Sequence, residues 1–218
     1  MATSPPPAGW YPHDSGFRWW DGSAWTSHTQ PSKVSTVLAE PILQFVTKAG
    51  LLAQGDTTIL DQNDRRIGSL VEQRNGASTT WLANELHVVD TSGRPILRVI
   101  DESFGTYRFV VERPWAGPVG EIIQDNVLGA AKLSLRAGGR RVGSIHREKS
   151  RWSDFSVVDE SGKKIASVTT TVEQKKYAVP GRYVVTRLLL RGSPDPVASL
   201  VVASAMKVGR VFGAERSD

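Results

Sequence analysis

The most concentrated chemical groups in this sequence are basic side chains. Residues 132–191 contain fourteen Lys or Arg and five Asp or Glu, a formal charge of +9, whereas residues 41–131 carry eight basic and eleven acidic residues, or −3. A surface of positive sign attracts anions such as phosphate, lipid headgroups or nucleic acid. Charge alone does not choose among these three partners.

Two basic pairs, Arg140-Arg141 and Lys163-Lys164, fall at turns between predicted strands, so we expect them to project together. Near an anionic leaflet, such residues gain about 1 kcal/mol each. The competing interpretation is that basic turns only keep the strands soluble and prevent edge pairing. The candidate residues for headgroup binding are Arg140, Arg141, Lys149, Arg151, Lys163, Lys164, Lys175 and Lys176.

The sequence carries no recognisable motif for catalysis or metal binding. Its four histidines are isolated from one another, so no pair has the spacing of two ligands on one helix face. It has no G-x-S-x-G, no P-loop and no dinucleotide-binding glycine motif. The lack of cysteine excludes thiolate metal sites and a cysteine nucleophile. We therefore predict a protein that is not an enzyme, with no catalytic residue, metal or cofactor.

Tryptophan is concentrated at the N-terminus, where four of the seven lie in the first 25 residues. Few aliphatic residues are nearby, so these rings are expected to form the mini-core of a small module. The alternatives are a groove for a proline-rich peptide and a contact with a membrane interface. The candidate interaction residues are Trp10, Tyr11, Trp19, Trp20 and Trp25.

Turn residues and hydrophobic periodicity predict the elements that hold these side chains. Residues 1–29 are expected to form the small Trp-rich β module, with Asp21-Gly22 as a turn, and residues 30–40 a linker. Residues 41–213 repeat a hairpin pattern six times, in which an apolar strand, a Gly-containing turn and an alternating strand follow one another. Six hairpins predict about twelve strands, and closing such a sheet removes its edges.

The pattern changes to a helix after Asp195-Pro196. Residues from about 196 to 212 are apolar on almost every side, so this helix must be enclosed. Its length of about 25 Å is close to the height of a barrel wall. The predicted fold is mostly β: a twelve-stranded antiparallel barrel around a buried C-terminal helix, plus the Trp-rich N-terminal β module.

The hairpin series resembles the tubby-like C-terminal superfamily, in particular its phospholipid scramblase and LURP-one-related branch. The resemblance covers about residues 41–212 and rests on D-x-x-G-[RK]-x-[IV] turns at residues 90–96 and 159–165, and on the helix sequence L-V-V-A-S-A-M. It implies a twelve-stranded barrel around a central helix, and a lipid-related role. Scramblases carry a palmitoylated cysteine-rich stretch and an EF-hand-like loop, but this sequence has no cysteine and no complete EF-hand pattern.

The N-terminal segment resembles a short bacterial domain of unknown function. Residues 9–14 read G-W-Y-P-H-D and residues 18–26 read R-W-W-D-G-S-A-W-T, close to the signature G-W-Y-P-D-P followed by R-[YW]-W-D-G-x-x-W-T. His13 and Asp14 depart from the usual Asp-Pro at this point of the signature. The resemblance implies a bacterial origin.

These observations predict a scramblase-like phospholipid-binding protein that acts at a membrane surface, with phospholipid scrambling as a further activity. We expect it to be cytoplasmic and peripheral at the inner face of the plasma membrane. The expected partners are an anionic phospholipid surface and a protein bound through the N-terminal module. One alternative function is a non-lipid protein-interaction scaffold that uses this module. Nucleic-acid binding is a minor alternative, because the basic half has few aromatic residues and no recognised motif.

Overall fold

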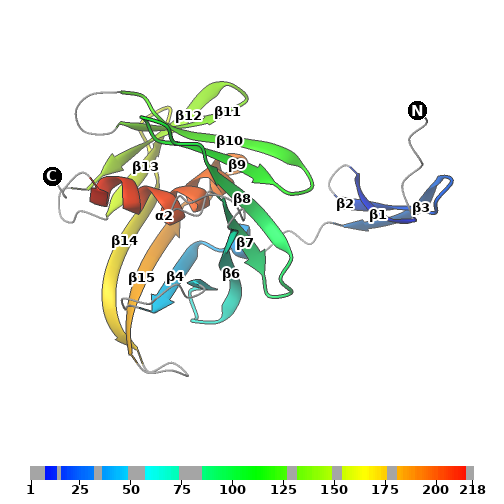
Figure 1. The fold of residues 1–218 in the computed structure, drawn as a ribbon, viewed down its shortest axis with the longest axis horizontal. Helices are drawn as coiled ribbons and strands as arrows, with labels where there is room; N and C mark the ends of the chain where they lie inside the picture. The colour runs from blue at the N-terminus through cyan, green and yellow to red at the C-terminus, as the bar shows by residue number, and fades with distance from the viewer. Residues whose placement is uncertain are drawn as a thin grey trace. The chain divides into compact units, whose positions relative to one another are not determined.

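The structure is a computed structural model that describes residues 8–13, 16–31, 36–48, 57–73, 85–126, 132–148, 154–175 and 181–214. The chain divides into two compact units, Met1–Ser35 and Thr36–Asp218. Figure 1 shows the elements of both units.

The N-terminal unit is a small antiparallel sheet, with three strands in its described residues: β1 (Gly9–His13), β2 (Gly16–Trp20) and β3 (Trp25–Pro31). The predicted Asp21-Gly22 turn joins β2 to β3. Asp21 Oδ1 accepts hydrogen bonds from the backbone N–H groups of Ser23 and Ala24, both at 2.7 Å. Gly22 has a φ of 101°, a conformation that favours glycine. The predicted β module is therefore present.

A closed antiparallel barrel forms the second unit, and the described residues contribute twelve strands to it (Figure 1). Each strand pairs with its neighbour in sequence, and β15 closes the barrel by pairing with β4. The predicted barrel is confirmed. The strands are β4 (Ile42–Lys48), β5 (Thr57–Leu60), β6 (Arg66–Gln73), β7 (Glu85–Asp90), β8 (Pro95–Asp101), β9 (Arg108–Arg113), β10 (Gly117–Gln124), β11 (Leu133–Ala137), β12 (Arg140–Arg147), β13 (Phe155–Asp159), β14 (Lys164–Lys175) and β15 (Gly181–Leu190).

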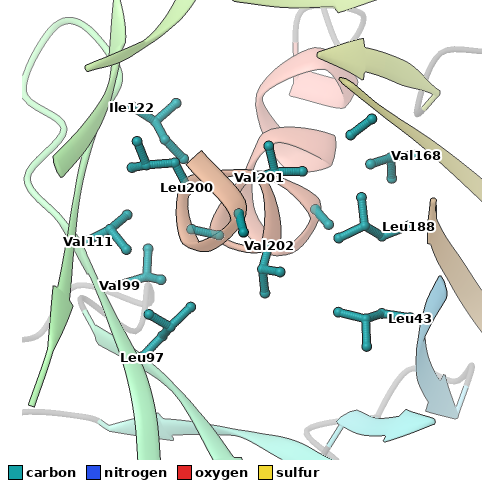
Figure 2. Packing of buried hydrophobic residues seen from close by; sticks show 14 of the residues in the cluster. Leu43, Leu97, Val99, Val111, Ile122, Val168, Leu188, Leu200, Val201 and Val202 are labelled. Atoms are coloured by element: carbon teal, nitrogen blue, oxygen red, sulfur yellow. The ribbon is translucent and has the colours of Figure 1, made fainter. Parts of the chain in front are cut away.

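Helix α2 (Val197–Ala214) runs through the barrel, as the all-round apolar pattern predicted. Figure 2 shows Leu200 on the side of Ile122 and Val111, with Leu188 and Leu43 across the helix from them. These side chains are all buried. Every second residue of the strands points into this core, in agreement with the alternation of apolar residues in the sequence.

Hydroxyl groups on α2 find partners on the helix itself and just before its start. Ser204 Oγ donates a hydrogen bond to the Leu200 carbonyl at 2.8 Å, and Ser199 Oγ donates to Asp195 Oδ1 at 2.6 Å. The Arg113 guanidinium contacts the Asp195 carboxylate from the end of β9. These bonds satisfy hydroxyls that would otherwise be costly to bury.

A short helix, α1 (Thr36–Ala39), lies within the stretch predicted as a linker. Val37 is fully buried and belongs to the barrel core. A Cβ built on Gly68 would lie 2.5 Å from the Val89 carbonyl oxygen and 3.3 Å from Val37 Cγ2, so glycine at that position allows both the neighbouring strand β7 and the valine to come close. Polarity in residues 30–40 indicated a linker, but the apolar side chains of Val37 and Leu38 attach part of it to the barrel.

Candidate anion-binding surface at one end of the barrel

A β-bulge close to the turn recurs in five hairpins of the described barrel. In β5–β6, β7–β8, β9–β10, β11–β12 and β13–β14, the Cα register skips one residue of the second strand. Each skipped residue belongs to the core or packs against it, so the bulge directs an apolar side chain inward. The skipped residues are Ile67, Ile96, Val119, Val142 and Ile165.

Basic pairs come directly before the bulge residue in three of these hairpins. The bulge turns the following Ile or Val toward the core, which leaves the preceding pair at the tip of the hairpin. All six basic side chains are exposed. The pairs are Arg65-Arg66, Arg140-Arg141 and Lys163-Lys164.

All five bulged hairpins have their turns at the same end of the barrel. Consecutive strands of an antiparallel barrel alternate in direction, so turns that follow every second strand share one end. We call this the hairpin end. The chain also leaves β15 here: Arg191 N donates to the Ile165 carbonyl at 2.9 Å, beside the start of β14. The predicted pairs Arg140-Arg141 and Lys163-Lys164 therefore lie at one end, on neighbouring hairpins.

Aspartates at the start of three turns hold the turns in shape. In the β13–β14 turn, Asp159 Oδ1 accepts hydrogen bonds from the backbone N–H groups of Ser161 at 2.9 Å and Lys163 at 3.0 Å. Asp61 and Asp90 accept equivalent bonds from the residues two and four positions later. These carboxylates are structural parts of the turns.

The same hydrogen bonds keep the turn aspartates ionised. The Ser161 hydroxyl, which donates at 2.6 Å, is the largest cause that lowers the pKa of Asp159 below its usual value. At Asp61 and Asp90 burial alone would raise the pKa, but the backbone donors and a neighbouring arginine outweigh it, so both pKa values are lowered.

Ion pairs neutralise some of the basic side chains at the hairpin end. Arg65 pairs with Asp61 and Lys164 with Glu148, at 2.8 and 2.9 Å. Five other exposed cations form no ion pair within 4 Å among the described residues, and we call them the hairpin-end cations. They are Arg66, Arg140, Arg141, Lys163 and Arg191.

The structure separates the eight headgroup candidates predicted from the sequence. Arg140, Arg141, Lys163 and Lys164 lie at the hairpin end, whereas Lys175 is the last residue of β14, at the opposite end. The other three, Lys149, Arg151 and Lys176, lie outside the described residues. A run of positive charge in the sequence therefore does not form one surface, because successive turns alternate between the two ends.

Two hairpin-end cations, Arg66 and Arg191, were not among the candidates predicted from the sequence. The sequence contains an indication of Arg66, because Arg65-Arg66-Ile67 has the same order of two arginines and an apolar residue as Arg140-Arg141-Val142. The summed charge gives no indication of Arg66, because residues 41–131 are acidic in total. Arg191 follows the last strand and has no equivalent in the repeat.

An aromatic cluster lies on the N-terminal unit. The rings of Trp20 and Trp25 are 5.1 Å apart and those of Tyr11 and Trp25 are 5.9 Å apart, both edge to face. The carbonyl of Trp19 accepts a hydrogen bond from Thr26 Oγ1 at 3.0 Å. Trp25 is 45% exposed, so the cluster has an accessible side. The side chain of the fifth predicted residue, Trp10, lies outside the described part of the chain.

The described residues contain no group of three side chains able to hold a metal ion. In that part of the chain, no helix has the length and apolar character needed to cross a membrane.

Comparison with known proteins gives one family match, at the N-terminus of the chain. A family model described as "Protein of unknown function (DUF2510)" matches residues 8–37, in agreement with the resemblance of the N-terminal motifs to a domain of unknown function. The X-ray structure of a protein from Arabidopsis thaliana is similar to this chain with a TM-score of 0.47 and 14% sequence identity, covering 81% of this chain and 94% of that chain. No curated protein matches the chain. The resemblance of residues 41–212 to the scramblase branch stays a prediction.

Proposed function

We propose that the hairpin end of the barrel binds anionic phospholipid headgroups, so that the protein attaches peripherally to a membrane surface. The observation that carries the proposal is the set of five hairpin-end cations, which are exposed and have no ion-pair partner in the described chain. Cations already paired within a protein gain little from an anionic surface, whereas these five keep their charge for an external partner. The sequence resemblance to a lipid-related family points the same way.

The aspartates at the start of these turns suit this role because they already accept hydrogen bonds within the turns. Asp61 and Asp90 accept backbone hydrogen bonds and pair with Arg65 and Arg94 of the same turns. The proposal is restricted to headgroup binding, because α2 and the inward side chains of the strands pack the barrel interior. At a cytoplasmic leaflet, the attraction would come from its negative surface potential.

Vesicle binding of the full chain tests the proposal. Vesicles of phosphatidylcholine with phosphatidylglycerol should bind the protein, vesicles of phosphatidylcholine alone should not, and added salt should weaken the binding. A variant that combines Arg140→Gln, Arg141→Gln and Lys163→Gln should bind the anionic vesicles roughly 100-fold more weakly, at about 1 kcal/mol for each cation.

A matched control removes the same charge from the opposite end. Lys48, Lys132 and Arg182 are exposed, and the strand directions place them away from the hairpin end. The combination Lys48→Gln, Lys132→Gln and Arg182→Gln should retain most of the binding. Equal losses in the two variants would show that net charge, not the hairpin end, attracts the vesicles.

The alternative of a protein-interaction scaffold is favoured by a different observation, the accessible edge-to-face cluster of Tyr11, Trp20 and Trp25. Exposed aromatic rings on small sheets bind proline-rich peptides. If the full chain does not bind anionic vesicles at low salt, this scaffold role becomes the preferred function.

A further inference from the structure

A cavity of about 460 Å³ lies on the outer face of β12 and β13, next to the hairpin end. Ser144 pairs with Val158 and Gly143 with Asp159, which sets the two strands side by side along the cavity. Ile145 and Val157 alternate with Ser144 and Val158 and point into the barrel core, so Ser144 and Val158 face outward and the cavity lies outside the barrel. Its lining residues are Arg141, Ser144, His146, Val158, Asp159, Glu160 and Gly162.

The β12 side of the cavity offers hydrogen-bond donors and positive charge. Arg141 is a hairpin-end cation whose Nε donates to the Gly143 carbonyl at 3.4 Å, which leaves its terminal N–H groups for another acceptor. Ser144 Oγ and His146 Nε2 are 3.2 Å apart. A guanidinium, a hydroxyl and an imidazole together match the acceptor oxygens of a phosphate.

The β13 side of the cavity carries two carboxylates. Asp159 Oδ1 is held by the turn and the pKa of this carboxyl is lowered, so the group is ionised at neutral pH. Glu160 is exposed and has no hydrogen bond or ion pair in the described chain. A ligand with only a phosphate would be repelled by these groups. A ligand that also carries an ammonium would satisfy both sides of the cavity.

We propose that this cavity binds the headgroup of a phospholipid that bears a primary ammonium, of the phosphoethanolamine type. The phosphate lies against Arg141, Ser144 and His146, and the ammonium, two carbon atoms away, lies against Asp159 and Glu160. This inference rests on the proposed function and names the lipid class of the same surface.

The cavity should discriminate against choline headgroups. A primary ammonium donates three hydrogen bonds, which the carboxylates accept, whereas a quaternary ammonium donates none. Quaternary ammonium groups are bound by aromatic cages, and the only aromatic ring among the lining residues is the imidazole of His146. The expected order of binding is therefore phosphoethanolamine before phosphocholine.

Vesicles and a soluble probe together test this inference on the full chain. At a constant fraction of phosphatidylglycerol, replacing phosphatidylcholine by phosphatidylethanolamine should tighten vesicle binding about fivefold, the value of a favourable exposed ion pair. In amide NMR spectra, O-phosphoethanolamine should shift the signals of Ser161 and Gly162, and phosphocholine should not.

Two variants locate the effect. Glu160→Gln should remove the preference for phosphatidylethanolamine without weakening the binding to phosphatidylglycerol, because it takes a negative charge away from the hairpin end. The control Glu102→Gln changes an exposed glutamate at the opposite end and should keep the preference. Both proteins should unfold at the temperature of the unmodified chain, since both side chains are exposed.

The outcomes separate this inference from the proposed function. Equal binding of the two zwitterionic lipids, or equal shifts with both soluble probes, would overturn the headgroup site even if anionic vesicles still bind. Amide shifts that appear only with O-phosphoethanolamine would support the site. If those shifts appear but the protein does not bind anionic vesicles, the proposed membrane attachment is overturned and the headgroup site is retained.

Discussion

Replacing Leu200 by alanine tests whether α2 holds the barrel together from inside. Leu200 is fully buried on the side of Ile122 and Val111. Truncation of such a leucine removes buried methyl groups and leaves a cavity, at a cost of about 3 kcal/mol within a range of roughly 2–5 kcal/mol. For a chain of this size, about 2–4 °C of Tm is lost per kcal/mol, so we expect a fall of about 6–12 °C.

Thermal unfolding followed by circular dichroism measures this change. The matched control is Val172→Ala, because Val172 is 55% exposed and its truncation should cost less than about 0.5 kcal/mol. Leu200→Met nearly conserves the volume and should restore most of the loss. Below its Tm, the Leu200→Ala protein should bind vesicles normally. A fall in Tm no larger than that of Val172→Ala would refute the internal position of the helix.

Two further predictions concern the hairpins that carry the cations. A Cβ on Gly143 would lie 2.7 Å from the Val158 carbonyl oxygen, so Gly143→Ala should lower the free energy of unfolding by about 1–3 kcal/mol, and an unchanged urea midpoint would contradict this close packing. The lowered pKa values of Asp61, Asp90 and Asp159 mean that the unfolded chain takes up protons first on acidification, so stability should fall as the pH drops below about 4. In the Asp159→Asn protein, the free energy of unfolding measured by urea titration should decrease less as the pH is lowered. An identical dependence of this free energy on pH in the two proteins would argue against an ionised Asp159.

Local patterns in the sequence were sufficient to predict the elements of the barrel. The turn residues depend on short-range chemistry: Asp159 bonds to backbone groups two and four residues later, and glycine takes the positive φ at position 162. The apolar character of residues from about 196 to 212 on almost every side required an enclosure, which the strands provide around α2. These features are encoded within a few residues, so a sequence is enough to recognise them.

The functional surface was only partly predictable. Arg140-Arg141 and Lys163-Lys164 were recognised as basic turns, but the sequence does not state which turns share an end of the barrel. Strand direction decides this, and it separates Lys175 from the other candidates while bringing Arg66 and Arg191 to them. The net charge of a segment of sequence combines residues from both ends of the barrel, so it does not show how charge is divided between the ends.

The sequence by itself determined the turns, the alternating strands and the need to bury the helix, because each follows from the types and spacing of residues close together in the chain. Tertiary structure alone decided which cations lack an ion-pair partner and that Arg141 and Glu160 line one cavity. These properties depend on the closure of the barrel and on side chains that meet across strands. In the closed barrel, residues distant in the sequence become neighbours, and their charges act together on one surface.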